Sequence, residues 1–582
     1  MKDYILDWSK KVNIQKNTII TCFENLFSYH PKEDYQFSIP ETLEKKQEQN
    51  YSSESSSNLE LPKNIFPTLS VNLEVLTSRY NTMINSDIII REFSLTAKNK
   101  EYKAFLFYID GMVDTTSINH FVLDPLMLRN SANTYQSPES EVIKEAITNN
   151  IVVRKVKKFD LASYIYNHLV PQNSVEQVDT FDDVASGVNS GNCALFVDTL
   201  NIVFNIDVKG FKQRSVEKPE NEIVIRGSQE GFTENIRTNT SLLRRFVNNE
   251  KLIIENIEVG NLTKTKCAVC YMKNIANTDL IAEVKYRLNN IDVDTIISSG
   301  QLEQLIEDNG KFSLPQLISS ERPDKASNFL LEGRVVILVN GSPYCLIAPG
   351  TFIDFITSPE DLNLKFQFAN LLKIIRILAV ILTLLLPGLY VAITNFHQEL
   401  IPTELLFAIV AARESIPLPI IFEILVMEVS FELIREAGLR VPSPIGPTIG
   451  IVGALILGQA AVDANIVSPI LIIVVAITAI ASFAIPDFSF GFHCRIARFV
   501  YIAFGYFLGF LGIAFCLFTH FLILSELKSF GYSYLQPYIP VTKDYKGIFL
   551  SPSWKREHRA SFLNTKRPKR QADISMTWKN NK

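Results

Sequence analysis

The chain has 582 residues, which is more than one hydrophobic core usually serves, so we expect several domains. Its net charge of −4 indicates no particular partner and no nucleic acid, and its seven scattered cysteines exclude a disulfide framework. The first residues lack the apolar core of a signal peptide, so we expect residues 1–365 to stay in the cytoplasm.

Residues 1–64 are predicted to be a flexible N-terminal extension. Their second part, from residue 41 onward, is rich in Glu, Lys, Gln and Ser and cannot bury enough apolar surface to offset its chain entropy. From residue 65 to 365, apolar residues at helical spacing alternate with strand-like runs. This pattern predicts an α/β region.

The α/β region contains two similar halves. Residues 104–126 resemble residues 267–288, and residues 191–210 resemble residues 333–350. We therefore predict two related α/β subdomains that meet across a cleft or hinge, able to bind a ligand or to transmit movement. Their expected bounds are 65–210 and 211–365.

Residues 366–526 are predicted to form a transmembrane helical domain. Four apolar runs are long enough to cross a bilayer: 375–394, 445–461, 466–485 and 499–524. Basic residues precede the first run and fill the tail at 527–582, so both termini are expected on the cytoplasmic side. The tail itself is predicted to be a basic cytoplasmic segment.

One further apolar segment, at 418–437, carries three glutamates. Its apolar residues gain about 5 kcal/mol on insertion into lipid, whereas the glutamates cost nearer to about 8 kcal/mol. The segment therefore cannot be an isolated lipid-facing helix. We expect a partial or interfacial helix that packs in an oligomer, borders water or lies at the membrane surface.

The glutamates of this segment are the candidate ion path: Glu423, Glu428 and Glu432. Glu428, Glu432 and Arg435 share one helix face, and in a homo-oligomer such acids would repeat as a ring that attracts cations. The alternative is an interfacial helix whose acids face water or pair with nearby arginines. Two glycine pairs with helix-packing spacing accompany it: Gly446 with Gly450, and Gly505 with Gly509.

No pattern indicates an enzyme. The chain has no phosphate-binding glycine loop, nucleophile elbow or metal-binding helix motif. Cys267 and Cys270 have the spacing of half a zinc site, but they lie in a predicted strand without a second pair, so we interpret them as ordinary buried cysteines. We expect no catalytic residue, cofactor or metal.

Long stretches of the chain resemble the A subunits of GerA-type spore germination receptors. The likeness is carried by residues 214–246, 321–343, 417–464, 467–488 and 535–540 and extends over roughly 65–555. It implies a subunit of a nutrient receptor in the inner membrane of a bacterial endospore, beside a transporter-like B subunit and a lipoprotein C subunit. It further implies a homo-oligomer that contacts membrane lipid and supplies a channel for monovalent cations.

The resemblance also marks a set of charged residues as contacts between subdomains or subunits, with simple surface solvation as the alternative: Arg226, Glu230, Glu234, Arg244, Arg245, Glu321, Arg322 and Asp324. A non-conducting scaffold, like the related stage V sporulation protein AF, is the competing function. An independent nutrient transporter is a more distant one.

Overall fold

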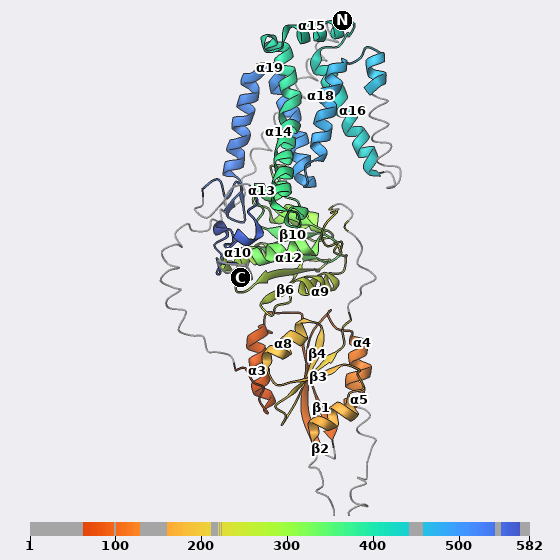
Figure 1. Ribbon diagram of the computed structural model, residues 1–582, viewed down its shortest axis with the longest axis vertical. Helices are drawn as coiled ribbons and strands as arrows, with labels where there is room; N and C mark the ends of the chain where they lie inside the picture. Colours follow the sequence, from red (N-terminus) through yellow and green to blue (C-terminus); the bar gives the residue numbers. More distant parts are fainter. Residues whose placement is uncertain are drawn as a thin grey trace, which may run out of the picture.

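The computed structural model describes residues 62–97, 100–127, 160–210, 219, 222, 224–440, 458–541 and 549–570. Almost all of the predicted N-terminal extension lies outside these residues, as do Gly446, Gly450 and most of the predicted span 445–461. Along the long axis of the molecule lie one α/β subdomain, a second α/β subdomain and a group of long helices (Figure 1).

The first subdomain contains a five-stranded antiparallel sheet in the order β1-β2-β4-β5-β3. Leu106 of β2 faces one hydrophobic core, whereas its neighbours Phe105 and Phe107 face another. Both faces of the sheet are covered there, in agreement with the continuous apolar run at 104–109 in the second half of β2. The strands are β1 (Ile88–Ala97), β2 (Lys100–Ile109), β3 (Val175–Val178), β4 (Asn192–Val197) and β5 (Val203–Asp207).

The helices of the first subdomain cover both faces of its sheet. On one face lie α3 (Leu69–Tyr80) and α8 (Phe181–Asn189). On the other face lie short segments, several with π-helical turns: α4 (Thr115–Ile118), η3 (Asn119–Leu123), α5 (Asp124–Met127), α7 (Leu161–Tyr164) and η5 (Ile165–Leu169).

The second subdomain repeats this topology. Its antiparallel sheet has the order β6-β7-β9-β10-β8, so each strand matches the strand five places earlier in the first sheet. The repeated order agrees with the duplication expected from the sequence. The elements are β6 (Leu252–Val259), β7 (Thr265–Met272), β8 (Ile318–Ser320), β9 (Val335–Val339), β10 (Cys345–Ala348), α9 (Ile236–Phe246), α10 (Thr278–Asn289), α11 (Ser299–Ile306), α12 (Pro323–Glu332) and α13 (Phe352–Ile356).

Local sequence signals set the ends of several of these helices. The side chain of Thr180 accepts a hydrogen bond from the Asp183 amide at the start of α8, as an N-cap residue does. Helix α12 begins with Pro323 and ends at Gly333, whose φ of 104° favours glycine.

The main helices of the helical domain are α14 (Phe366–Phe396), α15 (Thr403–Arg413), α16 (Ile420–Arg440), α18 (Pro469–Phe483) and α19 (Phe488–Glu526), with a short 3-10 helix η8 (Gln398–Leu400) and a helical stretch at 458–463. Helices α14, α16, α18 and α19 extend along the long axis, whereas α15 lies across their far end (Figure 1). Within the described ranges, α14 and α19 are long and apolar enough to cross a membrane, and α18 is a shorter apolar helix.

Helix α19 folds back on itself at Gly509. That residue has φ 60° and ψ −140°, which is not helical. His493 and His520 lie 27 residues apart, about 40 Å along a straight helix, yet their Nε2 atoms are 3.3 Å apart. The structure therefore has two antiparallel arms, 488–508 and 510–526, where the sequence predicted one span over 499–524. A glycine that we interpreted as a packing residue is the turn.

The helical domain is attached to the second subdomain at both of its ends. Helix α13 leads into α14, and after α19 the chain forms the hairpin of β11 (Lys528–Ser529) and β12 (Tyr532–Ser533) against the same subdomain. Residues 549–570 of the predicted basic tail also pack there. Phe562 and Leu563 are buried, and the Lys566 amide donates to the Ile275 carbonyl at 3.0 Å.

Substitution of Gly509 tests the fold-back of α19. Gly509→Ala should destabilise the protein by about 1–3 kcal/mol, because this backbone conformation is nearly restricted to glycine. The measurement is thermal unfolding of the purified full-length protein in detergent. The control is Gly491→Ala in the same helix, where an added Cβ makes only ordinary contacts at 3.8 Å. Equal melting of both variants would contradict the turn.

Candidate functional site

The carboxylates of α16 are buried against the neighbouring helices. Ile420, Ile424 and Met427 of α16 pack with Leu471 and Val475 of α18, which holds this helix inside the domain. Glu423 and Glu428 are 1% and 0% exposed, whereas the Glu432 side chain is 27% exposed. Burial of charged groups is costly unless they are paired, so their partners decide what this site can do.

Arg498 in the first arm of α19 joins two of these carboxylates. Its Nη2 atom lies 3.0 Å from Glu428 Oε2 and 3.0 Å from Glu432 Oε1. Arg495, one turn earlier, places Nη1 at 2.9 Å from Glu432 Oε2. The side chains of Arg498 and Glu428 are each 1% exposed. Two acids and two bases therefore form an ion-pair network between α16 and α19.

Arg435 completes this charge cluster, which we define as Glu428, Glu432, Arg435, Arg495 and Arg498. The Arg435 Nη1 atom lies 3.7 Å from Glu432 Oε1, and its Nη2 atom donates to the Ser482 hydroxyl of α18. Its guanidinium also lies over the Phe483 ring, 4.2 Å from the centroid. With all five groups ionised, the cluster carries two negative and three positive charges.

The hydrogen bonding of the charge cluster is incomplete. Among the described residues, the Nε atoms of Arg435 and Arg498 and both carboxylate oxygens of Glu428 lack a well-oriented hydrogen-bond partner. Glu428 is thus held by proximity to Arg498 rather than by an aligned bidentate pair. A buried polar network that is only partly satisfied favours rearrangement, because each unpaired group adds a desolvation cost.

Glu423 belongs to a separate contact. Arg413 of α15 places Nη2 at 3.3 Å from Glu423 Oε1, and the amide of Ser468 before α18 donates to Glu423 Oε2 at 3.2 Å. This carboxylate therefore joins three helix ends. The three predicted ion-path glutamates thus lie in two contacts, and all of them pair with arginines of the same chain.

The sequence analysis placed Glu428, Glu432 and Arg435 on one helix face, and the structure has them together. It missed Arg495 and Arg498, which supply the strongest contacts. Two arginines three residues apart at the start of an apolar run were the available signal, since charged residues in such helices generally have a partner.

A close helix contact lies next to the cluster. A Cβ atom on Gly505 would lie 2.7 Å from the Gly388 carbonyl oxygen of α14, and one on Gly388 would lie 2.8 Å from the Tyr501 carbonyl oxygen. Only glycine permits this approach of α14 and α19. The predicted packing residue Gly505 therefore lies at a contact within one chain, and Gly509 lies at the turn.

A hydrogen-bonded series of side chains connects the two arms of α19 with the second subdomain. Ser313 lies 2.7 Å from His493 Nδ1, His493 lies 3.3 Å from His520, and the Tyr501 hydroxyl lies 3.3 Å from His520 Nδ1. His520 lies in the second arm of α19. Its contacts link the helices to the soluble region.

Arg244 forms a buried ion pair between the two subdomains. It is 2% exposed and binds both carboxylate oxygens of Asp87, at 2.8 and 2.9 Å. Asn85 accepts a third hydrogen bond from Arg244 and also one from the Ile254 amide of β6, at 3.0 Å. The segment before β1 is thereby held against an edge strand of the second sheet.

The other charged residues singled out from the sequence have different positions. Arg245 pairs with Glu230, and Arg322 forms two hydrogen bonds with Asp324 while donating to two backbone carbonyls. Glu321 accepts from the Glu222 amide at 2.8 Å. These contacts lie within the second subdomain. Arg226 and Glu234 are exposed.

Cys267 and Cys270 are fully buried on β7, where burial raises the pKa of both thiols, to about 12 for Cys267. Among the described residues, no group of three or more His, Cys, Asp or Glu side chains has the arrangement of a metal site.

Comparison with known proteins identifies the family of this chain. The model of the Bacillus/Clostridium GerA spore germination protein family matches residues 74–562. The chain belongs to the GerA family. Spore germination protein KA of Bacillus subtilis is 38% identical over 86% of this chain and 87% of its own length. The uncharacterized membrane protein YfkQ of the same organism is 36% identical over 84% of this chain and 90% of its own length.

One solved structure is also similar to this GerA-family chain. It is the crystal structure of the N-terminal domain of the A subunit of the Bacillus megaterium spore germinant receptor GerK3. The sequences are 31% identical, and the likeness covers 50% of this chain and 97% of that one, with a TM-score of 0.34. The family assignment is based on the sequence matches.

Arg244→Gln tests the contact between the subdomains of this GerA-family chain. Loss of the guanidinium leaves Asp87 buried without its charged partner, which should cost about 3–5 kcal/mol. The measurement is chemical unfolding of the full-length protein. The control is Arg237→Gln, because Arg237 pairs with Asp110 but is 52% exposed and should contribute less than about 1 kcal/mol. Equal effects would contradict a dominant role for Arg244.

Two glutamates near the start of α19 predict a pH dependence. Burial raises the pKa of Glu303 to about 8 and that of Glu307 to about 7, and the negative charges of Glu307 and Asp487 add to the shift at Glu303. The folded state therefore binds protons more tightly than the unfolded chain does, so their contribution to stability falls as the pH rises from 4.5 to about 8.

Glu303→Gln should accordingly raise the melting temperature at pH 8, with a smaller gain at pH 5, as followed by thermal unfolding of the full-length protein. The exposed Glu258 provides the control, because a substitution at an exposed position should change the melting temperature little. A gain for Glu303→Gln that does not depend on pH would contradict the shifted pKa.

Proposed function

We propose that this GerA-family chain is a subunit of a nutrient-responsive spore germination receptor that oligomerises in the spore inner membrane and gates the release of monovalent cations. Membership of the family supports the germination role. The observation that carries the gating role is the charge cluster of α16 and α19. A transporter-like B subunit and a lipoprotein C subunit are the proposed partners.

The surface of the helical domain supports a membrane position. Ile480 of α18 and Phe507 and Leu511 of α19 are 71%, 73% and 71% exposed, and lipid would cover such apolar side chains. Helix α14 leaves the second subdomain, and the second arm of α19 returns to it. The soluble regions before and after the helices therefore lie on one side, which we propose to be the cytoplasmic side of a multi-pass domain.

The charges of the cluster favour a gate over a pore wall made of free carboxylates. Glu428 and Glu432 are neutralised by arginines, and the cluster has an excess of one positive charge, which repels cations in this conformation. Separation of α16 from α19 would expose both carboxylates. The incomplete hydrogen bonding of Glu428 and Arg498 lowers the cost of such a rearrangement.

The outer face of α16 is suited to an oligomer contact. Phe422, Val426, Val429 and Leu433 follow one another at helical spacing, and all are between 46% and 65% exposed. This apolar stripe lies on a different side of the helix from the paired glutamates. A neighbouring subunit seated on the stripe would therefore act on α16 and, through it, on the charge cluster.

A scaffold without conduction of its own is the second candidate function. Its support is the attachment of the helices to the second subdomain at both ends, through α13 and through β11 and β12. This arrangement transmits movement between the soluble and helical regions whether or not the chain conducts ions. In this case a separate protein would provide the channel.

Substitutions in the charge cluster test the gate. Arg498→Gln leaves Glu428 buried without its partner Arg498, so the closed state should lose stability. Cation release in spores should change by about tenfold for each 1.4 kcal/mol by which the closed state is destabilised. The double variant Arg498→Gln with Glu428→Gln should restore much of the behaviour, because it removes both charges. Potassium release is measured with and without nutrient.

The matched control is Glu414→Gln, which changes an exposed glutamate just beyond α15. Protein levels are compared by immunoblotting of spore membranes. Wild-type release by all cluster variants at normal protein level would overturn the gate. Assembly without any current in planar bilayers, alone or with partner subunits, would favour the scaffold.

A further inference from the structure

A cavity of about 320 Å³ lies where the helical domain meets the second subdomain. Its walls come from both regions. Helix α14 contributes Ile377, Val380 and Ile381, α19 contributes Phe521, and the soluble side contributes α13 and the segment after β12. Its volume lies at the lower end of the range of ligand sites, and its lining is almost entirely apolar.

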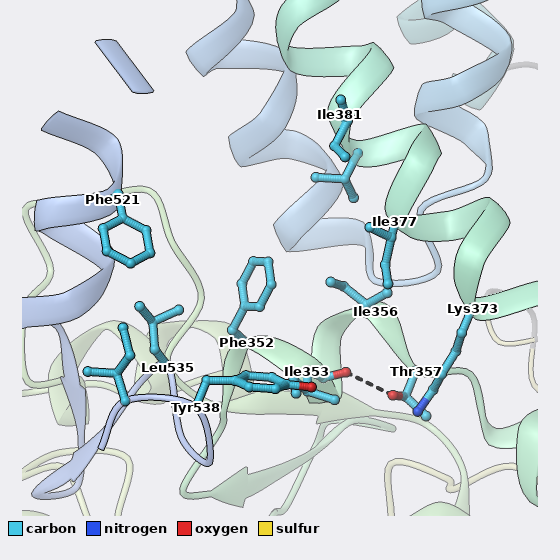
Figure 2. A pocket seen from close by; sticks show the side chains of 12 residues that line it. Phe352, Ile353, Ile356, Thr357, Lys373, Ile377, Ile381, Phe521, Leu535 and Tyr538 are labelled. Atoms are coloured by element: carbon cyan, nitrogen blue, oxygen red, sulfur yellow. Dashed lines mark hydrogen bonds between the residues drawn. The ribbon is translucent and has the colours of Figure 1, made fainter. Parts of the chain in front are cut away.

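The cavity continues into the apolar exterior of the helices. In Figure 2, Ile377 and Ile381 lie on one side and Phe521 on the other, with Phe352 and Tyr538 at the base. Ile381 and Phe521 are 47% and 53% exposed. They adjoin further exposed apolar residues, including Leu378 of α14 and Leu517 of α19, at 52% and 43%. A chain-like apolar molecule could therefore enter along the outer surface between the two helices.

At the end of the cavity nearest the soluble region, the polar groups turn away from the interior, and the surface that lines it is apolar. Lys373 extends from the start of α14, and its amine lies beside the Thr357 hydroxyl at the end of α13 (Figure 2). Thr357 itself donates to the Ile353 carbonyl at 2.8 Å. Lys373 is 4% exposed, so the lining at this end comes from apolar atoms and suits a hydrocarbon chain.

We infer that this cavity binds an acyl chain of a phospholipid of the cytoplasmic leaflet, in the space between α14 and α19. The inference rests on the membrane placement proposed above and not on channel activity. The bound lipid contacts α13 of the second subdomain and both helices that attach the helical domain to it. Lipid is thereby a structural part of the joint.

The test uses the full-length protein in nanodiscs of phosphatidylglycerol. Some of the lipid molecules carry a photoreactive diazirine near the methyl end of one acyl chain. After illumination, labelled peptides are identified by mass spectrometry. We expect labelling of Phe352–Thr357 and Leu535–Ile539, which belong to the soluble side of the cavity. Labelling confined to the outer faces of the helices would overturn the inference.

Two variants sharpen this test. Ile377→Trp fills the cavity and should lower labelling of Phe352–Thr357 by about tenfold or more, whereas Leu378→Trp, at the adjacent outward-facing position, should leave it unchanged. Size-exclusion chromatography checks the folding of both variants. If Ile377→Trp fails to fold, Ile381→Trp at the cavity mouth replaces it. Undiminished labelling in the folded cavity variant would overturn the site.

Labelling of the outer face of α14 distinguishes the two proposals. If the helical domain does not contact lipid at all, the peptide that contains Leu378 stays unlabelled, and the membrane placement fails together with the site. If that peptide is labelled but Phe352–Thr357 is not, the lipid site alone fails. The outcome does not depend on whether the chain conducts ions.

Discussion

A single guanidinium, paired with two carboxylates, joins the carboxylate-rich helix of the helical domain to its neighbour. Arg498 lies between Glu428 and Glu432, and the three side chains connect the carboxylate-rich helix α16 to the first arm of α19. Without this arginine, α16 would carry buried negative charge that neither lipid nor the apolar face of α18 can compensate. The same ionic contact holds α16 in its position. Because the contact is not fully hydrogen-bonded, a rearrangement of α16 costs less free energy than it would from a fully bonded contact.

The soluble region is organised around a second buried arginine. Arg244 binds the segment before β1 to the edge of the second sheet, so the two copies of the α/β unit are joined by a hydrogen-bonded contact at their boundary. The attachments of the helices that the described residues make lie on the second copy. A signal that begins in the first subdomain would therefore cross the boundary at which Arg244, Arg237 and Arg79 pair before it reaches α14 through the second subdomain.

Much of this arrangement could be predicted from local patterns. The paired likeness of 104–126 with 267–288 and of 191–210 with 333–350 indicated two copies of one unit, and the sheets share one strand order. The face shared by Glu428, Glu432 and Arg435 follows from helical periodicity. These features depend on residues close together in the chain or on a repeat that can be recognised by comparison.

The partners of those residues could not be predicted, because they depend on tertiary contacts. Arg498 and Glu428 are 70 positions apart, and nothing local to either one reveals the other. The reversal at Gly509 was missed for a related reason. A glycine in an apolar run is equally compatible with a packing contact and with a turn, and only the approach of His493 to His520 decides between them. Asn85 was missed because a single buried amide leaves no periodic signal.

The attachment of α14 and of the second arm of α19 to one subdomain has a mechanical consequence. Both segments are attached to the second subdomain, so a rotation of that subdomain moves them together and changes the contact between them little. Among the described residues, α15 and α16 follow α14 at the far end of the bundle, whereas the junction of α18 and α19 lies beside the second subdomain, where Ile485 and Phe490 join its hydrophobic core. A displacement of α16 relative to the first arm of α19 would therefore act on the contact that contains the paired charges.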